Sequence, residues 1–163
     1  MKIGIISDTH DAFLEIQSAI TFFKANNVEA IIHAGDFTTK ESALEFLNTK
    51  IPFYGVLGNV DQTIDGPREI SRGSIKEPPY TLVLGDKSFI IVHDTNTIDL
   101  DKESLVVDVI VCGNTHKALI EPKNRALMIN PGEGCGTNTG KPTVALLDTE
   151  TMNAEIHELE NNY

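Results

Sequence analysis

Short apolar runs alternate with amphipathic segments along the first third of the chain. The apolar runs predict buried strands at 2–7, 28–33 and 53–57. Between them, apolar residues recur at helical spacing and predict helices over 12–25 and 39–48. Strands that alternate with helices in this way imply a parallel sheet whose strands are joined by right-handed crossovers.

Polar residues mark where these two helices are expected to begin. Asp11 precedes the first helix and is predicted as its N-cap, and Thr38 or Thr39 is predicted as the N-cap of the second. Pro52 follows the second helix and marks its exit, because proline cannot continue a helix. The capping residues therefore agree with the boundaries of the apolar pattern.

The pattern of the second half is typical of strands. The segment 62–79 is polar, contains Gly and Pro, and is expected to be a loop. Strands are predicted at 80–84, 88–93, 107–112, 117–121, 126–130, 142–148 and 154–159, and a short helix is predicted within 99–107. The last two strands are expected to pair through a turn. This order favours an α/β (α+β) fold in a single domain over residues 1–163, with two packed sheets flanked by helices.

Charge and cysteine content narrow the function classes. The 163 residues include 24 acidic and 13 basic side chains, so the net charge of −11 argues against a surface for nucleic acid or for an acidic membrane. The apolar runs are strand-sized and too short for a membrane span. Cys112 and Cys135 lack the spacing of a zinc or redox motif and are expected to be reduced packing residues. A cytoplasmic protein is therefore predicted.

Polar side chains gather where the apolar runs end. Asp8 and His10 follow the first strand, and Asp36 follows the second. The full set of such residues is Asp8, His10, Asp36, Asn59, His93, Asn114 and His116. Open α/β sheets keep their sites at the carboxyl ends of strands, so these groups are expected to converge on a divalent cation. Asp36 has two carboxylate oxygens and could bridge to a second cation.

The order of these motifs resembles that of the calcineurin-like metallophosphoesterases, and in particular of their small archaeal and bacterial phosphodiesterases. The motifs are D-x-H at 8–10, G-D at 35–36, G-N-x-D at 58–61, a lone His93, G-x-x-H at 113–116 and I-N-P-G-E at 129–133. The resemblance covers nearly the whole chain. It implies a four-layer αββα sandwich, in which helices flank two mixed sheets, with a dinuclear metal centre at one edge.

The resemblance also implies roles for these residues. Asp8, His10 and His116 would hold the first cation, Asn59 and His93 the second, and Asp36 would bridge them. Mn²⁺ is favoured, with Ni²⁺, Fe or Zn²⁺ as alternatives. A metal-bridging hydroxide would attack phosphorus in line while the cations stabilise the developing charge. Asp61 would either orient Asn59 or help to protonate the leaving group, and the first role is preferred.

Two departures from the family pattern affect the second cation. Asn114 stands where the family has the first histidine of G-H-x-H, so this cation loses an imidazole and is expected to bind weakly. As a turn residue, Asn114 is equally well explained without any cation. His93-Asp94-Thr95 replaces H-G-H, and Asp94 should point away from His93 because neighbours on a strand face opposite sides. His33 is expected to be a buried, hydrogen-bonded histidine rather than a ligand.

The leading prediction is a metal-dependent phosphohydrolase acting on a small phosphodiester or phosphorylated substrate. A phosphodiesterase is favoured over a monoesterase, because Val60 stands where larger phosphatases of the family carry a histidine near the leaving group. The alternative is a weak or inactive phosphoesterase fold that serves as a protein-interaction scaffold, as in the retromer subunit of this architecture. Homo-oligomerisation is left open.

Overall fold

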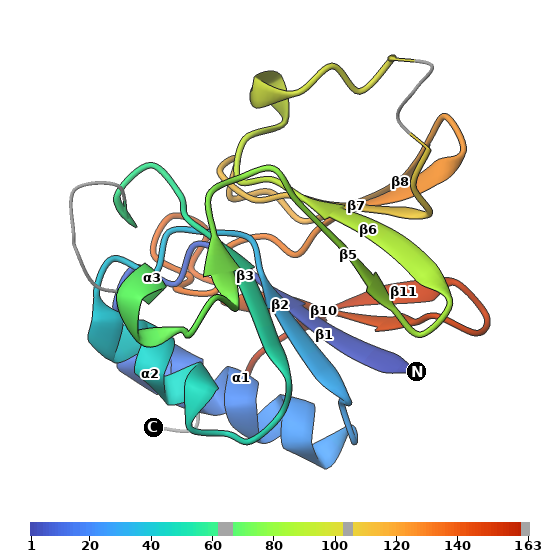
Figure 1. Cartoon of the computed structure of the whole chain (residues 1–163). Coiled ribbons are helices and arrows are strands. Elements are labelled where there is room, and N and C mark those ends of the chain that lie inside the picture. Colours follow the sequence, from blue (N-terminus) through green and yellow to red (C-terminus); the bar gives the residue numbers. More distant parts are fainter. Residues whose placement is uncertain (62–66, 103–105, 161–163) are drawn as a thin grey trace.

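Two β-sheets stack face to face in the computed structural model, which describes residues 1–61, 67–102 and 106–160 (Figure 1). The first sheet has the order β11-β10-β1-β2-β3-β4. Its strands are β1 (Lys2–Ile6), β2 (Ala30–His33), β3 (Phe53–Val56), β4 (Ile75–Lys76), β10 (Thr143–Asp148) and β11 (Asn153–Glu158). The second sheet has the order β5-β6-β7-β9-β8. Its strands are β5 (Tyr80–Leu84), β6 (Lys87–Ile91), β7 (Val109–Val111), β8 (Leu119–Lys123) and β9 (Ala126–Asn130).

Parallel pairing brings the carboxyl ends of the central strands to one edge of each sheet. In the first sheet β1, β2 and β3 run parallel, with Ile6 opposite His33 and His33 opposite Gly55. In the second sheet β6, β7 and β9 run parallel, with Val111 opposite Ile91 and Ile129. Antiparallel neighbours complete both sheets, which are therefore mixed as predicted.

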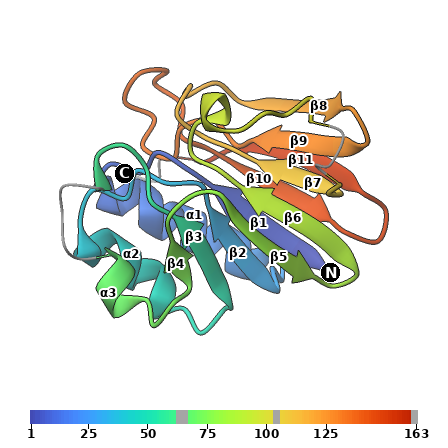
Figure 2. The same ribbon diagram turned by 45° about the horizontal axis from the view of Figure 1, so that its top comes forward.

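Helices cover the outer face of the first sheet. They are α1 (Phe13–Ala25), α2 (Lys40–Leu47) and α3 (Pro67–Ile70), and both ribbon views place them on the side away from β5–β9 (Figure 2). The apolar stripe of α1 puts Ile16, Ile20 and Phe23 into one buried cluster with Ile31 of β2 and Phe46 of α2. Burial of each such side chain contributes about 1.5–3 kcal/mol, which holds the helices on the sheet.

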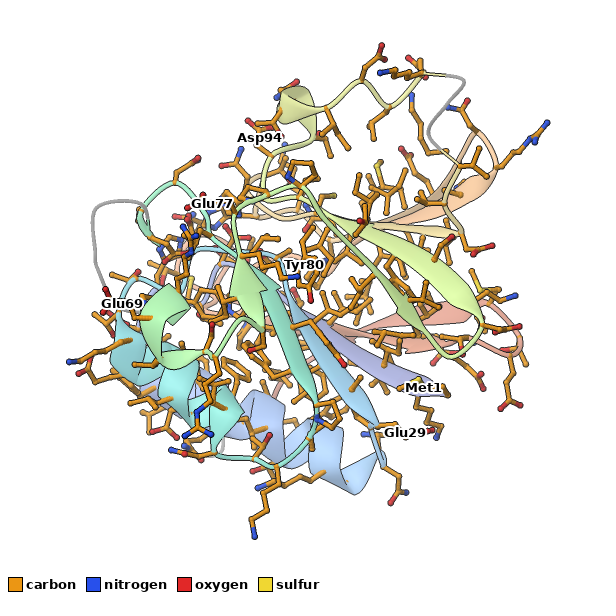
Figure 3. All side chains as sticks on the ribbon, viewed as in Figure 1. Met1, Glu29, Glu69, Glu77, Tyr80 and Asp94 are labelled. Atoms are coloured by element: carbon orange, nitrogen blue, oxygen red, sulfur yellow. The ribbon has the colours of Figure 1, made fainter. Side chains whose placement is uncertain are left out.

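The inner faces of the two sheets form the main core. Ile5 and Ile32 of the first sheet pack with Phe89 and Val111 of the second in one cluster of buried residues. Figure 3 shows side chains filling the space between the sheets, with Tyr80 at this boundary. The two sheet edges are thus held together, so the loops that leave them face one another.

The outer face of the second sheet is covered by the segment that follows β6. Ile98, Leu100 and Val107 pack on a cluster that includes Ile110 and Met128. This segment carries a 3₁₀ helix, Thr95–Thr97, which is visible above the second sheet in Figure 1. The prediction of two mixed sheets with flanking helices is confirmed, and this segment supplies the layer beyond the second sheet.

Two local predictions of secondary structure are wrong. The helix expected within 99–107 is absent from its described residues, 99–102 and 106–107, and the helical turn lies earlier. The turn starts earlier because the Asp94 side chain accepts a hydrogen bond from Asn96 N and caps it there. The expected loop at 62–79 contains α3 and β4, and β4 gains hydrogen bonds by extending the parallel sheet beside β3. The remaining residues of that loop, 62–66, lie outside the described part.

Asp11 does not cap α1, contrary to the prediction. The N-cap position of α1 is Ala12, without a side-chain hydrogen bond. Asp11 has a positive φ of 57°, and its Oδ1 accepts hydrogen bonds from Thr39 N, Thr39 Oγ1 and Ser42 Oγ at the start of α2. Thr39 is the N-cap of α2, as one of the two predicted alternatives had it. Asp11 therefore ties the first loop to the second helix.

In the described part of the chain, the helices are all too short or too polar to cross a membrane.

Candidate metal centre

The loop after β1 and the loop after β7 bring together a first group of ligands. Ligand atoms of Asp8, His10 and His116 lie within 4.8 Å of one another. His116 Nε2 is 3.5 Å from Asp8 Oδ1, and the rings of His10 and His116 stack with centroids 5.5 Å apart. Two imidazoles and a carboxylate at this spacing suit one divalent cation.

A second group adjoins the first and shares Asp8 with it. Ligand atoms of Asp8, Asp36 and His93 also lie within 4.8 Å of one another, and all three residues are buried. Asp36 Oδ2 is 3.4 Å from His93 Nε2 and 3.6 Å from His10 Nε2. This oxygen therefore lies near one imidazole from each side of the site.

Two buried atoms in these groups lack a hydrogen-bond partner among the described residues, Asp8 Oδ1 and His93 Nε2. His93 Nδ1 lies 2.7 Å from Ala34 O, and a carbonyl oxygen only accepts, so Nδ1 donates its proton there. The other ring nitrogen then faces carboxylate oxygens and needs a positive partner, either a proton or a cation. Buried polar atoms are normally paired, so the arrangement fits a metal site.

The pKa values of Asp8, Asp36 and His93 depend on one another and on burial. Burial raises the pKa of Asp8, and the net shift is upward despite the nearby imidazoles of His93 and His116. Burial also raises the pKa of Asp36, but the adjacent His93 and the Val60 N–H lower it more, so its net shift is downward. Burial lowers the pKa of His93, whereas Asp36 and Asp8 raise it above its ordinary value. A cation bound beside His93 must displace a proton that Asp36 stabilises.

The backbone at the site is bent into the left-handed region. Residues of the candidate set with positive φ are Asp8 (53°), His10 (41°), Asp36 (61°), Asn114 (64°) and His116 (58°). Each such non-glycine conformation costs on the order of 1–3 kcal/mol, and such strain is concentrated at functional sites. The sharp turns point several side chains from short loops toward one centre.

The two asparagines of the predicted set lie against each other. Asn59 Nδ2 donates to Asn114 Oδ1 at 3.1 Å, and Asn114 N donates to Asp8 Oδ2 at 3.1 Å. Asp94 is turned toward the 3₁₀ helix, where Figure 3 labels it, and its Oδ1 accepts hydrogen bonds from Asn96. The amide oxygen of Asn114 is therefore occupied by Asn59.

Asp61 and His33 lie behind the candidate ligands and hold the loops. Asp61 is 1% exposed, and it accepts hydrogen bonds from Asp36 N, Gly58 N and Thr38 N, each at 2.8 Å. His33 is fully buried between Thr9 Oγ1 and Gly35 N, and burial lowers its pKa well below the ordinary value, so the ring stays neutral. His33 is thus the buried, hydrogen-bonded histidine that the sequence indicates.

Glu133, for which no role is predicted from the sequence, contacts the first group. Its Oε2 lies 2.7 Å from His116 Nδ1, and the residue is 1% exposed. A glutamate in a glycine-rich turn directly after a buried strand is the signal that could have indicated it. The cysteines are both buried, and burial raises the pKa of Cys112 to about 12, which agrees with a packing role.

This fold and this cluster of imidazoles and carboxylates are those of a metallophosphoesterase. The family profile of the calcineurin-like phosphoesterase superfamily domain matches residues 1–152, and the chain belongs to that superfamily. The match confirms the family resemblance and the prediction of a metal-dependent phosphoesterase.

Among individual proteins, the chain is 36% identical over 156 residues to the phosphodiesterase MJ0936 of Methanocaldococcus jannaschii, covering 92% of this chain and 94% of the relative. A solved structure of an archaeal phosphodiesterase matches with a TM-score of 0.84 and 34% identity, covering 98% of this chain and 100% of that chain. Vacuolar protein sorting 29 of Cryptosporidium parvum matches with a TM-score of 0.70 and 18% identity, over 98% of each chain. That likeness shows the fold alone.

Proposed function

We propose that this chain hydrolyses small phosphodiesters with two divalent cations. The observation that carries the proposal is the position of Asp36 Oδ2, which lies 3.6 Å from His10 Nε2 and 3.4 Å from His93 Nε2. An oxygen between imidazoles of two ligand groups is placed to be shared by two cations. The similarity to a phosphodiesterase of Methanocaldococcus jannaschii supports the choice of substrate class.

The proposed ligands divide between two positions. Asp8, His10 and His116 would hold the first cation, His93 and Asn59 the second, and Asp36 would bridge. Carboxylate and imidazole donors favour Mn²⁺, with Ni²⁺, Fe or Zn²⁺ as alternatives. When bound, such cations supply Lewis acidity toward the phosphoryl group and a nucleophile from water at neutral pH.

The remaining roles follow from hydrogen bonds within the chain. Ala34 O holds the Nδ1–H of His93 and thereby aims Nε2 toward Asp36. Asp61 is proposed as a positioning residue for the Asp36 loop, because backbone N–H groups occupy both its oxygens. Val60 is 37% exposed and offers no acid to a leaving group, so substrates with good leaving groups should react best.

The second cation is proposed to bind more weakly than the first. Asn114 Oδ1, its predicted ligand atom, accepts a hydrogen bond from Asn59 Nδ2. A cation that used this oxygen would have to replace that hydrogen bond. Asn114 is therefore proposed to orient the Asn59 amide, with direct coordination as the weaker alternative.

Hydrolysis of bis(p-nitrophenyl) phosphate with added Mn²⁺ or Ni²⁺ tests the function. Asp36→Ala is expected to lower kcat/KM by about 10³-fold, or roughly 4 kcal/mol of transition-state stabilisation. Asp86→Ala is the matched control, since Asp86 is an aspartate whose side chain is 80% exposed in the β5–β6 turn. Equal rates of hydrolysis for Asp36→Ala and the wild type would contradict the proposal.

A non-catalytic scaffold is the second candidate, and the hydrogen bond between Asn59 and Asn114 favours it. Calorimetric titration with Mn²⁺ separates the candidates. Tight binding of two cations without hydrolysis supports the scaffold, whereas slow turnover with one tightly bound cation supports an enzyme with a weak second position. Homo-oligomerisation, a cytoplasmic location and the lack of a nucleic-acid surface stay predictions.

A further inference from the structure

Glu133 is a buried carboxylate in the turn that follows β9. The residue is 1% exposed, and its side chain contributes two oxygens to the interior of the loop over 133–141. An isolated ionised carboxylate is costly to bury unless it is paired and hydrogen-bonded. The partners of both oxygens therefore indicate why a charged side chain is tolerated here.

The two oxygens have different partners. Oε1 accepts hydrogen bonds from Thr139 N at 2.5 Å and from Thr139 Oγ1 at 2.8 Å. Oε2 lies 2.7 Å from His116 Nδ1. The carboxylate is therefore anchored to its own loop on one side and directed at an imidazole on the other.

His116 Nδ1 has a second neighbour, Asn138 Nδ2, at 3.0 Å. One ring nitrogen cannot hydrogen-bond to both groups. The Asn138 amide N–H needs a lone pair on Nδ1 as its acceptor, whereas the ionised carboxylate of Glu133 needs a proton on Nδ1. A charge-assisted hydrogen bond at 2.7 Å is the stronger of the two, so Nδ1 carries the proton and donates it to Glu133.

This assignment decides what the other ring nitrogen offers. With the proton on Nδ1, Nε2 has a free lone pair, and it lies 3.5 Å from Asp8 Oδ1. That oxygen has no hydrogen-bond partner among the described residues. Two acceptors therefore face each other in the first ligand group, which is the arrangement that a cation satisfies.

We propose that Glu133 is a positioning residue that fixes the Nδ1–H form of His116 and turns its Nε2 toward the first cation. The inference rests on the proposed function, since it assigns Glu133 a task in the same site. A carboxylate behind a ligating histidine orients the ring and raises its basicity, and loss of such a partner weakens metal affinity by about 10–100-fold.

A separate cation site beside Glu133 is less well supported. Ligand atoms of His116, Glu133 and Cys135 also lie within 4.8 Å of one another. Both oxygens of Glu133 already accept hydrogen bonds, and Cys135 Sγ lies 3.9 Å from Oε2. Unlike Asp8, Glu133 therefore has no unpaired buried oxygen that calls for a positive ligand.

The test compares Glu133→Gln with Glu155→Gln. Glutamine is nearly isosteric, but it is neutral and can offer an N–H to the ring nitrogen. Glu155 is a matched control, because its Oε2 lies 3.6 Å from His157 Nε2 on β11 and the side chain is 62% exposed. Nitrogen NMR of the histidine rings in the metal-free protein reports the tautomer, and calorimetry with Mn²⁺ reports affinity.

The wild type is expected to show His116 with its proton on Nδ1 in the neutral form. Glu133→Gln is expected to raise the share of the Nε2–H form and to weaken Mn²⁺ binding by about 10–100-fold, while Glu155→Gln changes neither. Thr139→Val removes the hydroxyl that anchors Oε1. It should raise the share of the Nε2–H form and weaken Mn²⁺ binding, each by less than Glu133→Gln does. This second variant serves if Glu133→Gln does not fold.

A folded Glu133→Gln protein with the wild-type tautomer and Mn²⁺ affinity would overturn the inference, as would an unchanged Thr139→Val if only that variant folds. The proposed function fails in a different way, when the wild type itself neither binds Mn²⁺ nor hydrolyses the diester. The tautomer measurement needs no cation, so it tests the effect of Glu133 on His116 in either case.

Discussion

The two sides of the candidate metal centre differ in how their polar groups are supported. On the side of Asp8 and His116, a buried carboxylate, Glu133, backs the imidazole. On the side of His93, the ring is backed by the Ala34 carbonyl, and the asparagines proposed for this side, Asn59 and Asn114, bond to each other. Apart from the carboxylates of Asp8 and Asp36, the first side offers two imidazoles, His10 and His116, whereas the second offers the imidazole of His93 and the amide proposed as a ligand, Asn59.

If two cations bind as proposed, this difference in support should make the two positions unequal in affinity. Both sides share Asp36, and both depend on loops that meet in close contact. Gly113 lies against Ser7 and Asp8 in the loop that leads to His116, and Gly58 lies against Asp36 in the loop that carries Asn59, so the two glycines belong to loops of different sides. A substitution in one of these loops should therefore disturb mainly one side.

The largest effect is expected from filling these close contacts. In Gly113→Ala the new Cβ would overlap Ser7 Oγ and lie 2.8 Å from Asp8 Oδ2, and in Gly58→Ala it would overlap Asp36 Oδ1. Each change should lower the free energy of unfolding by about 1–3 kcal/mol, because the loops must move apart. Chemical denaturation measures the stability, and Mn²⁺ titration shows which position is lost.

Gly85→Ala is the control for these variants. Gly85 lies in the β5–β6 turn with φ 63°, and its nearest neighbour for a Cβ is Thr149 Oγ1 at 3.4 Å. Gly85→Ala should lower the free energy of unfolding by about 1–2 kcal/mol through backbone strain alone and leave Mn²⁺ binding unchanged. If Gly113→Ala and Gly58→Ala keep wild-type cation binding as well, the assignment of these glycines to the two sides is wrong.

A smaller effect is expected in the pH dependence of cation binding on the His93 side. The carboxylates of Asp36 and Asp8 hold the pKa of His93 above its ordinary value, despite burial, which lowers it. Below that pKa the ring is protonated, and a cation must displace the proton. Affinity at this position should therefore fall by up to about tenfold for each pH unit below the raised pKa, and should level off above it.

Mn²⁺ titrations between about pH 8 and about pH 6 measure this slope. In His93→Asn the second position should bind more weakly and lose the part of the slope that His93 contributes, while the first position keeps its own dependence. Identical slopes for the wild type and His93→Asn would show that the proton on His93 does not compete with the cation.

The smallest effect is expected at Asn114. Asn114→His restores the imidazole that the family pattern has at this position and removes the acceptor of the Asn59 amide. Because the second side gains a stronger donor, we expect about 3–10-fold tighter binding of the second cation and a rise in diester hydrolysis. If the change leaves both stoichiometry and rate unaltered, position 114 lies outside the coordination sphere.

Much of the fold could be predicted because the spacing of apolar residues along the chain indicates strands and helices locally. The apolar runs of β1, β2 and β3 and the helical spacing of α1 depend only on residues close in sequence. The short β4 could not be predicted from its sequence, since a strand of Ile75 and Lys76 gains its hydrogen bonds from β3. The partner of Asp11 was likewise hidden, because it belongs to α2 rather than to the adjacent helix.

The residue types at the strand ends and their order can be read from the chain alone, and they were enough to predict the family and a metal-dependent phosphoesterase. A carboxylate or an imidazole after a buried strand is visible in the chain without any knowledge of its neighbours. Which of these groups face one another depends on how the strands and their loops are placed in the folded molecule. The hydrogen bond from Asn114 N to Asp8 joins residues separated by 106 positions, and that from His116 to Glu133 depends on β7 and β9 lying side by side. The first contact arises from the packing of the two sheets and the second from the pairing of strands within one sheet, and no local pattern encodes either.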